Sequence, residues 1–140
     1  MNNNYYYSSI IVECHNGCAV CRRVTLERFI HHNLVYSYCL SIRIESTSAH
    51  VYKRLLDKIS NLCGSFSHST LLKGAMNNAL FFSFCTLYQQ EGIGWNKKGW
   101  YCSPLLIDCV RNDLYKFQNA LDFSVTQEMK GNLTQWFTPP

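Results

Sequence analysis

Charged side chains are scarce in this chain of 140 residues. Asp, Glu, Lys and Arg together make up 16% of it, whereas about a quarter is usual for a globular domain. Intrinsic disorder is excluded, because aromatic residues reach 14% and hydrophobic residues 47%, and disordered chains are poor in both. A surface with few charges also favours a binding partner or self-association, so a homo-oligomer is one expectation.

Acidic residues are few, and the common catalytic signatures are missing. There are nine Asp and Glu residues, and no pair of them has a spacing that suggests general acid–base chemistry. No Gly-x-Ser-x-Gly, phosphate-binding loop or His-Glu-x-x-His segment occurs. We therefore predict no catalytic residues. A Cys–His dyad stays open as an alternative, because its members can lie far apart in a sequence.

Long apolar runs are also absent. The run ALFFSFCTLY (79–88) is much shorter than the roughly 20 residues that cross a bilayer, so no membrane contact is expected. The first residues, MNNNYYYSSIIV, lack the basic and apolar regions of a signal peptide. We therefore expect a cytoplasmic, reducing location in which the eight cysteines stay thiols.

The hydrophobic pattern of the first half predicts a β-α-β-α unit over residues 1–64. Strands are expected at 5–13 and 35–45, the second because its apolar residues alternate strictly with polar ones. Between them, apolar residues at helical spacing predict a helix from about residue 20 to 33. A second helix is expected between a hydroxyl N-cap at residues 46–48 and Gly64.

The second half, residues 65–140, is expected to be mainly helical. A buried helix is predicted over 69–90, and another begins where Ser103 precedes Pro104 and runs to about Leu121. A hairpin is predicted at 93–102, and the tail has no clear period. The whole chain, 1–140, is therefore predicted to be a single α+β domain with one small mixed sheet.

Three of the cysteines fall within the stretch ECHNGCAVCRR (13–23). They are Cys14, Cys18 and Cys21, on a loop expected between a strand and a helix. Thiolates on an irregular loop can converge on a metal, and two adjacent arginines favour the deprotonated form. We predict a structural zinc site here. The candidates for its fourth ligand are His15, Cys39, Cys102 and Cys109.

The same spacing, Cys-x3-Cys-x2-Cys after a strand, resembles the cluster-binding motif of the radical-SAM enzymes. The resemblance covers eight residues and implies that Cys14, Cys18 and Cys21 hold three irons of a four-iron cluster. An iron–sulfur enzyme is therefore the alternative function. The sequence departs from the family at Val20, where an aromatic residue is usual, and lacks a Gly-Gly-Glu stretch after the second expected strand.

Two further interpretations of the cysteines remain. Cys18 and Cys21 form a C-x-x-C pair, and a helix start would lower a thiol pKa there, which suits redox chemistry. Free cysteine is also among the most buried residue types, so some thiols simply fill a core. We expect that structural role for three cysteines on apolar helix faces: Cys63, Cys85 and Cys109.

The stretch GWNKKGWYC (94–102) is the candidate nucleic-acid site. Aromatic side chains beside lysines bind single strands by stacking and phosphate attraction, which points to Trp95, Lys97, Lys98 and Trp100. The alternative is a hairpin with its indoles in the core. The formal charge of +4 permits contact with phosphates without requiring it. The sequence thus favours a small intracellular binding or regulatory protein that acts through protein or nucleic-acid contacts.

Overall fold

The structure is a computed structural model, and it describes residues 5–15, 18–30, 36–66, 68–90 and 104–123 of the chain. The described elements, in chain order, are β1 (Tyr5–His15), β2 (Cys18–Ile30), β3 (Tyr36–Ser46), α1 (Ala49–Leu62), the 3-10 turn η2 (Cys63–Ser65), β4 (Ser69–Met76), β5 (Ala79–Gln90) and α2 (Pro104–Leu121). Among these residues, no helix is long and apolar enough to cross a membrane.

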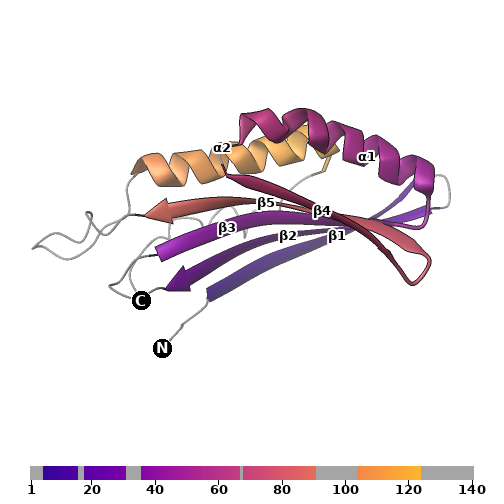
Figure 1. The fold of residues 1–140 in the computed structure, drawn as a ribbon, viewed down its shortest axis with the longest axis horizontal. Helices are drawn as coiled ribbons and strands as arrows, with labels where there is room; N and C mark the ends of the chain where they lie inside the picture. Colours follow the sequence, from indigo (N-terminus) through magenta and orange to yellow (C-terminus); the bar gives the residue numbers. More distant parts are fainter. Residues whose placement is uncertain (1–4, 16–17, 31–35, 67, 91–103, 124–140) are drawn as a thin grey trace, which may run out of the picture.

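The strands form one five-stranded sheet in the order β1-β2-β3-β5-β4. Every neighbouring pair is antiparallel, so the expectation of a mixed sheet is wrong. Both helices lie on the same side of the sheet (Figure 1), which gives two layers with one core between them. The predicted α+β class is confirmed.

The predicted helix over 20–33 is wrong, because residues 18–30 form β2. Every even-numbered position of β2 from Val20 to Arg28 is buried, and the positions between them, apart from Thr25, are half-buried or exposed, which is the period of a strand. His15 pairs with Cys18, so only two residues join β1 to β2. Those residues are Asn-Gly in the sequence, a strong hairpin signal. The first half is therefore β-β-β-α, not β-α-β-α.

The predicted helix over 69–90 is also wrong, because the segment forms the hairpin of β4 and β5. Asn77 and Asn78 join the two strands with positive φ angles of 52° and 64°. Asparagine tolerates this region, and two such residues in a row suit a two-residue hairpin turn. The described part of 65–140 thus holds a hairpin and one helix, and the hairpin expected at 93–102 lies outside the described residues.

The other elements agree with the sequence. Residues 5–13 and 36–45 fall in strands, and α2 begins at Pro104. Ser48 is the N-cap of α1, where its hydroxyl accepts a hydrogen bond of 3.3 Å from the Val51 N–H. Val51, Leu55 and Ile59 are buried, because they lie on the single apolar stripe of that helix.

The core lies between the helices and the even-numbered positions of β2, β3 and β5. It includes a cluster of three rings from separate elements, Phe66, Phe84 and Phe117, with centroids 5.1–5.6 Å apart. A buried polar contact lies beside it, where the Tyr88 hydroxyl donates to the carboxylate of Asp113. This face of the sheet is therefore fully committed to packing against α1 and α2.

Candidate functional site

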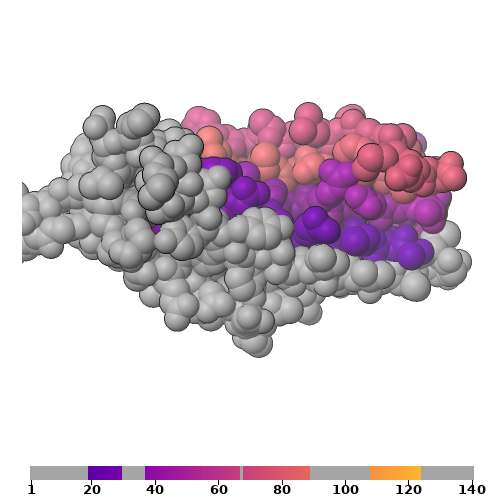
Figure 2. Space-filling model, turned by 90° about the horizontal axis from the view of Figure 1, so that it is seen from below, coloured from indigo at the N-terminus to yellow at the C-terminus, as the bar shows by residue number. Residues whose placement is uncertain are grey.

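Neither described helix lies on the opposite face of the sheet, which is called the open face here (Figure 1), and Figure 2 shows the described part of this face in colour. The antiparallel register places odd-numbered positions of β3 and β5 on it, together with even-numbered positions of β4. Its described residues on these three strands include Cys39, Arg43, Glu45, Thr70, Leu72, Gly74, Met76, Phe81, Cys85 and Leu87. Several are apolar and partly exposed, which is unusual for the solvent side of a sheet.

Two thiols meet on this face. Cys39 of β3 pairs with Leu87, and Ser41 pairs with Cys85 of β5, so the two cysteines are diagonal neighbours. Their side chains are within hydrogen-bonding reach. Thr70 of β4 pairs with Cys85 on the other side, and its Oγ1 lies 2.9 Å from the Cys85 Sγ. Three adjacent strands therefore supply the three groups.

The hydrogen bonds make the two sulfurs unequal. A hydrogen bond from Cys39 is the largest cause that lowers the pKa of Cys85, to about 6, and the Thr70 hydroxyl adds to it against the opposing effect of burial. The same bond, followed by burial, raises the pKa of Cys39. The Cys39 thiol and the Thr70 hydroxyl therefore favour the thiolate form at Cys85 over Cys39.

The thiol pair opens into a shallow pocket of about 330 Å³. Its lining consists of Cys39, His68, Ser69, Thr70, Cys85 and Leu87. The Leu87 side chain is 43% exposed at its rim. A small molecule or an exposed side chain of another protein can thus reach the thiolate from the open face.

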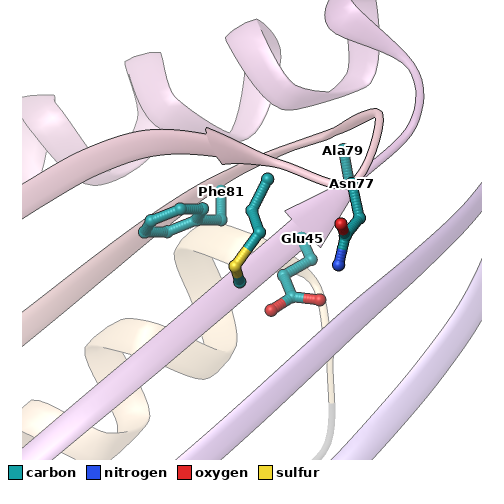
Figure 3. Close-up of a pocket in the computed structure, with 5 residues that line it drawn as sticks. Glu45, Asn77, Ala79 and Phe81 are labelled. Carbon is teal, nitrogen blue, oxygen red and sulfur yellow. The ribbon is translucent and has the colours of Figure 1, made fainter.

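A second cluster lies at the hairpin end of the same face. The guanidinium of Arg43 lies 4.1 Å from the ring centroid of Phe81, and its Nε donates to Glu45 at 2.9 Å. The ring covers Gly74, where an added Cβ would lie only 2.6 Å from its Cζ. A small pocket of about 180 Å³ adjoins Phe81, Glu45 and Asn77 (Figure 3). These contacts fix the β4–β5 hairpin against β3.

The three predicted metal ligands lie on paired strands and not on a loop. Cys14 pairs with Ala19, Cys18 with His15, and Cys21 with Val12, so the expected strand-to-helix loop is wrong. Positions 18 and 21 belong to opposite faces of the sheet, and position 14 shares the face of position 21. The side chains of Cys14 and Cys18 lie outside the described set, so the metal site itself stays a prediction.

None of the candidate fourth ligands with a described side chain is placed beside Cys21. Cys21 pairs with Glu45, and Cys39 lies six residues further along β3, which is about 20 Å at the rise of a strand. Cys109 is exposed on α2, and Cys102 and the side chain of His15 lie outside the described part. Within that part, no group of three or more His, Cys, Asp and Glu side chains is placed to hold a metal ion.

The three cysteines expected in the core differ from one another. Cys63 is half-buried and packs against the core, but Cys109 is exposed and Cys85 lies on the open face. The error for Cys85 follows from the wrong helix over 69–90. The nucleic-acid candidates Trp95, Lys97, Lys98 and Trp100 lie outside the described residues, so that site also stays a prediction.

Sequence reasoning missed the pairing of Cys39 with Cys85, because it depends on the register of strands that are distant in the chain. No family model, curated protein or solved structure matches this chain.

Proposed function

We propose that this protein is a binding protein that acts through the edge strand β4, and that a second copy of the chain is the partner this edge fits. β4 stands at one end of the sheet order. Among the residues that the structure describes, it pairs with β5 alone. Leu72 is 68% exposed and Met76 55%, so the edge carries apolar side chains that a partner can cover.

The hydrogen-bond polarity of β4 defines which backbone groups face outward. The Leu87 N–H donates to the carbonyl of His68 at 2.9 Å, so position 68 faces β5. Because strand residues alternate, the even-numbered positions of β4 also face β5. The N–H and C=O groups of the odd positions therefore point to the exposed edge: Ser69, Leu71, Lys73 and Ala75.

These outward groups match those of a second copy in one antiparallel register. Outward residues must pair with outward residues, so Ser69 pairs with Ala75 of the second copy and Leu71 with Lys73 of the second copy. All four outward residues are then used, and Leu72 lies opposite Leu72 of the second copy on the two-fold axis. A shift by two residues in one direction would place Lys73 opposite its own copy, which like charges disfavour, and in the other direction it would leave Ala75 without an outward partner in β4.

The outcome is a continuous sheet across an isologous dimer, the commonest oligomer symmetry. A leucine pair stands at its centre in a non-hydrogen-bonded position, where side chains approach most closely. This arrangement leaves the open face uncovered. The self-complementary register of β4 is the observation that carries the proposal.

The test is the oligomeric state, measured by sedimentation velocity over a wide concentration range. Lys73→Pro removes an outward N–H without touching the β4–β5 ladder, so it should abolish the dimer while the fold, checked by circular dichroism, persists. Lys73→Ala is the matched control and should dimerise at least as well as the unmodified chain. A chain that is monomeric throughout, or a proline variant that dimerises normally, would overturn the proposal.

We further propose a reducing, intracellular location. The cysteines with described side chains, Cys21, Cys39, Cys63, Cys85 and Cys109, are free thiols, which is in keeping with it. Zinc at Cys14, Cys18 and Cys21 remains an additional prediction. It is tested by metal analysis of the purified protein and of its Cys18→Ser variant.

A further inference from the structure

We infer that Cys39 and Cys85 form a thiol–disulfide exchange centre on the open face, and that its reaction partner is a neutral or positively charged disulfide. The geometry supplies a nucleophile, a second thiol beside it and an opening to solvent. Cys85 and Cys39 are diagonal neighbours on β5 and β3, and Thr70 Oγ1 lies 2.9 Å from the Cys85 Sγ. This site is separate from the outward backbone groups of β4, so it stands or falls independently of the dimer.

Cys85 is the attacking sulfur. Two donors converge on it, the Cys39 thiol and the Thr70 hydroxyl, and together they hold its pKa near 6. A thiol of this kind is largely ionised at neutral pH yet keeps useful nucleophilicity. Cys39 keeps its proton because the neighbouring thiolate and burial raise its pKa, so it acts second.

The chemistry requires two exchanges. The Cys85 thiolate attacks one sulfur of the disulfide RSSR, the Cys85–SR bond forms, and RS⁻ leaves with the electron pair and takes a proton from water. The Cys39 thiol then gives up its proton and attacks the Cys85 sulfur, which forms the Cys39–Cys85 disulfide and releases the second RS⁻. Two protein thiols are oxidised, and one RSSR is reduced to two RSH.

The diagonal placement makes this disulfide easy to reopen. Diagonal neighbours in an antiparallel pair lie about 7–8 Å apart at Cα. Most disulfides span roughly 4.4–6.8 Å between Cα atoms. Closing the bond must therefore draw β3 and β5 together locally. Disulfides formed under strain are the labile, exchangeable ones, which suits a reversible site better than a structural cross-link.

The surroundings select the charge of the partner. Glu27 of β2 pairs with Cys39, and its negative charge acts on both sulfurs. The pocket lining adds only neutral side chains and His68, which is exposed. Arg43, the other diagonal neighbour of Cys85 on β3, is ion-paired with Glu45 at 2.9 Å. An anionic disulfide would be repelled by Glu27 and by the Cys85 thiolate, whereas a cationic one would be attracted.

The first experiment uses 4,4′-dithiodipyridine, a neutral disulfide that releases a chromophore, and assigns the modified cysteines by peptide mass mapping. The unmodified chain should give a fast phase that ends in the Cys39–Cys85 disulfide. Cys39→Ser should keep the fast phase but stop as a mixed disulfide at Cys85, and Cys85→Ser should lose it. Cys63→Ser is the matched control and should behave like the unmodified chain.

The pH profile separates a tuned site from an exposed thiol. The rate at Cys85 should rise through a midpoint near pH 6, because the thiolate forms above the folded-state pKa. Thr70→Val removes one donor with little change of shape, so the midpoint should move upward. An unmoved midpoint, or a Cys85 that reacts no faster at pH 7 than Cys109, would overturn the inference.

Charge selection is tested with two physiological types of disulfide. Cystamine, which carries two ammonium groups, should oxidise Cys39 and Cys85 faster than glutathione disulfide, which is anionic. In the Glu27→Gln variant, the ratio of these two oxidation rates should be smaller. Equal rates in the unmodified chain would contradict the assigned partner class. A product that remains a mixed disulfide at Cys85 in the unmodified chain would rule out the exchange centre itself.

Discussion

The two faces of this sheet are built from alternate residues of the same strands, yet they have different roles. The covered face packs its side chains against two helices, and Phe84 is completely buried there. On the open face, one residue further along β5, Cys85 is only half-buried and accepts hydrogen bonds from groups on two neighbouring strands. One face therefore stabilises the fold, while the strands hold reactive and binding groups on the other.

The largest expected effect comes from the covered face. Phe84→Ala removes a ring that contacts Phe66 and Phe117, so it should lower the free energy of unfolding by about 3–5 kcal/mol. Leu87→Ala removes a partly exposed side chain of the same strand and should cost less than about 1 kcal/mol. Urea denaturation of both variants checks this. Equal losses would mean that the open face is packed as tightly as the covered one.

A smaller effect is expected from the buried polar contact. Tyr88→Phe leaves the carboxylate of Asp113 without its hydroxyl donor, which should cost about 2 kcal/mol. Lys116 Nζ, 3.5 Å from Asp113, retains part of the stabilisation. Tyr52→Phe is the control, because the Tyr52 hydroxyl is half-buried and donates to a backbone carbonyl. Thermal denaturation should rank the Tyr88 variant below the control, and the reverse order would contradict the prediction.

The smallest effect belongs to the open face. Gly74→Ala places a Cβ within 2.6 Å of the Phe81 ring, so the ring must turn away from Arg43. We expect a loss of about 1 kcal/mol, since a half-buried ring has room to move. In a chain that already carries Phe81→Leu, Gly74→Ala should leave the free energy of unfolding almost unchanged. A double-mutant cycle by urea denaturation measures this coupling, and additive effects would show that the two residues do not interact.

The sequence predicts the elements in which one face is buried and the other is wet. Residues 35–45 and the helix after Ser48 have clean periods, and the structure confirms the strand from Tyr36 onward and the helix. The segment 79–90 is different, because Phe81, Cys85 and Leu87 make its open face apolar as well. Apolar and polar residues then no longer alternate along the segment, so its pattern does not distinguish a strand from a buried helix. The Asn-Gly pair at 16–17 and the Asn-Asn pair at 77–78 were the available hairpin signals in the sequence.

The candidate site was less predictable than the fold. The cysteines that attract attention in the sequence, Cys14, Cys18 and Cys21, are close along the chain. Cys39 and Cys85 become neighbours only through the β3–β5 register, which no local pattern encodes. Residues brought together by distant strands carry no spacing signal, so tertiary structure was needed to find them.

The sheet order also has a consequence for how the chain folds. β1, β2 and β3 form a meander with short connections, and β4 with β5 forms a local hairpin, so each unit can assemble quickly. In the described sheet, the β3–β5 ladder is the pairing that joins the meander to the hairpin. Its two strands are separated along the chain by α1 and β4. Such non-local pairing is the slow event in β-rich folding. We therefore expect the β3–β5 ladder, on which Cys39 and Cys85 lie, to form last during folding.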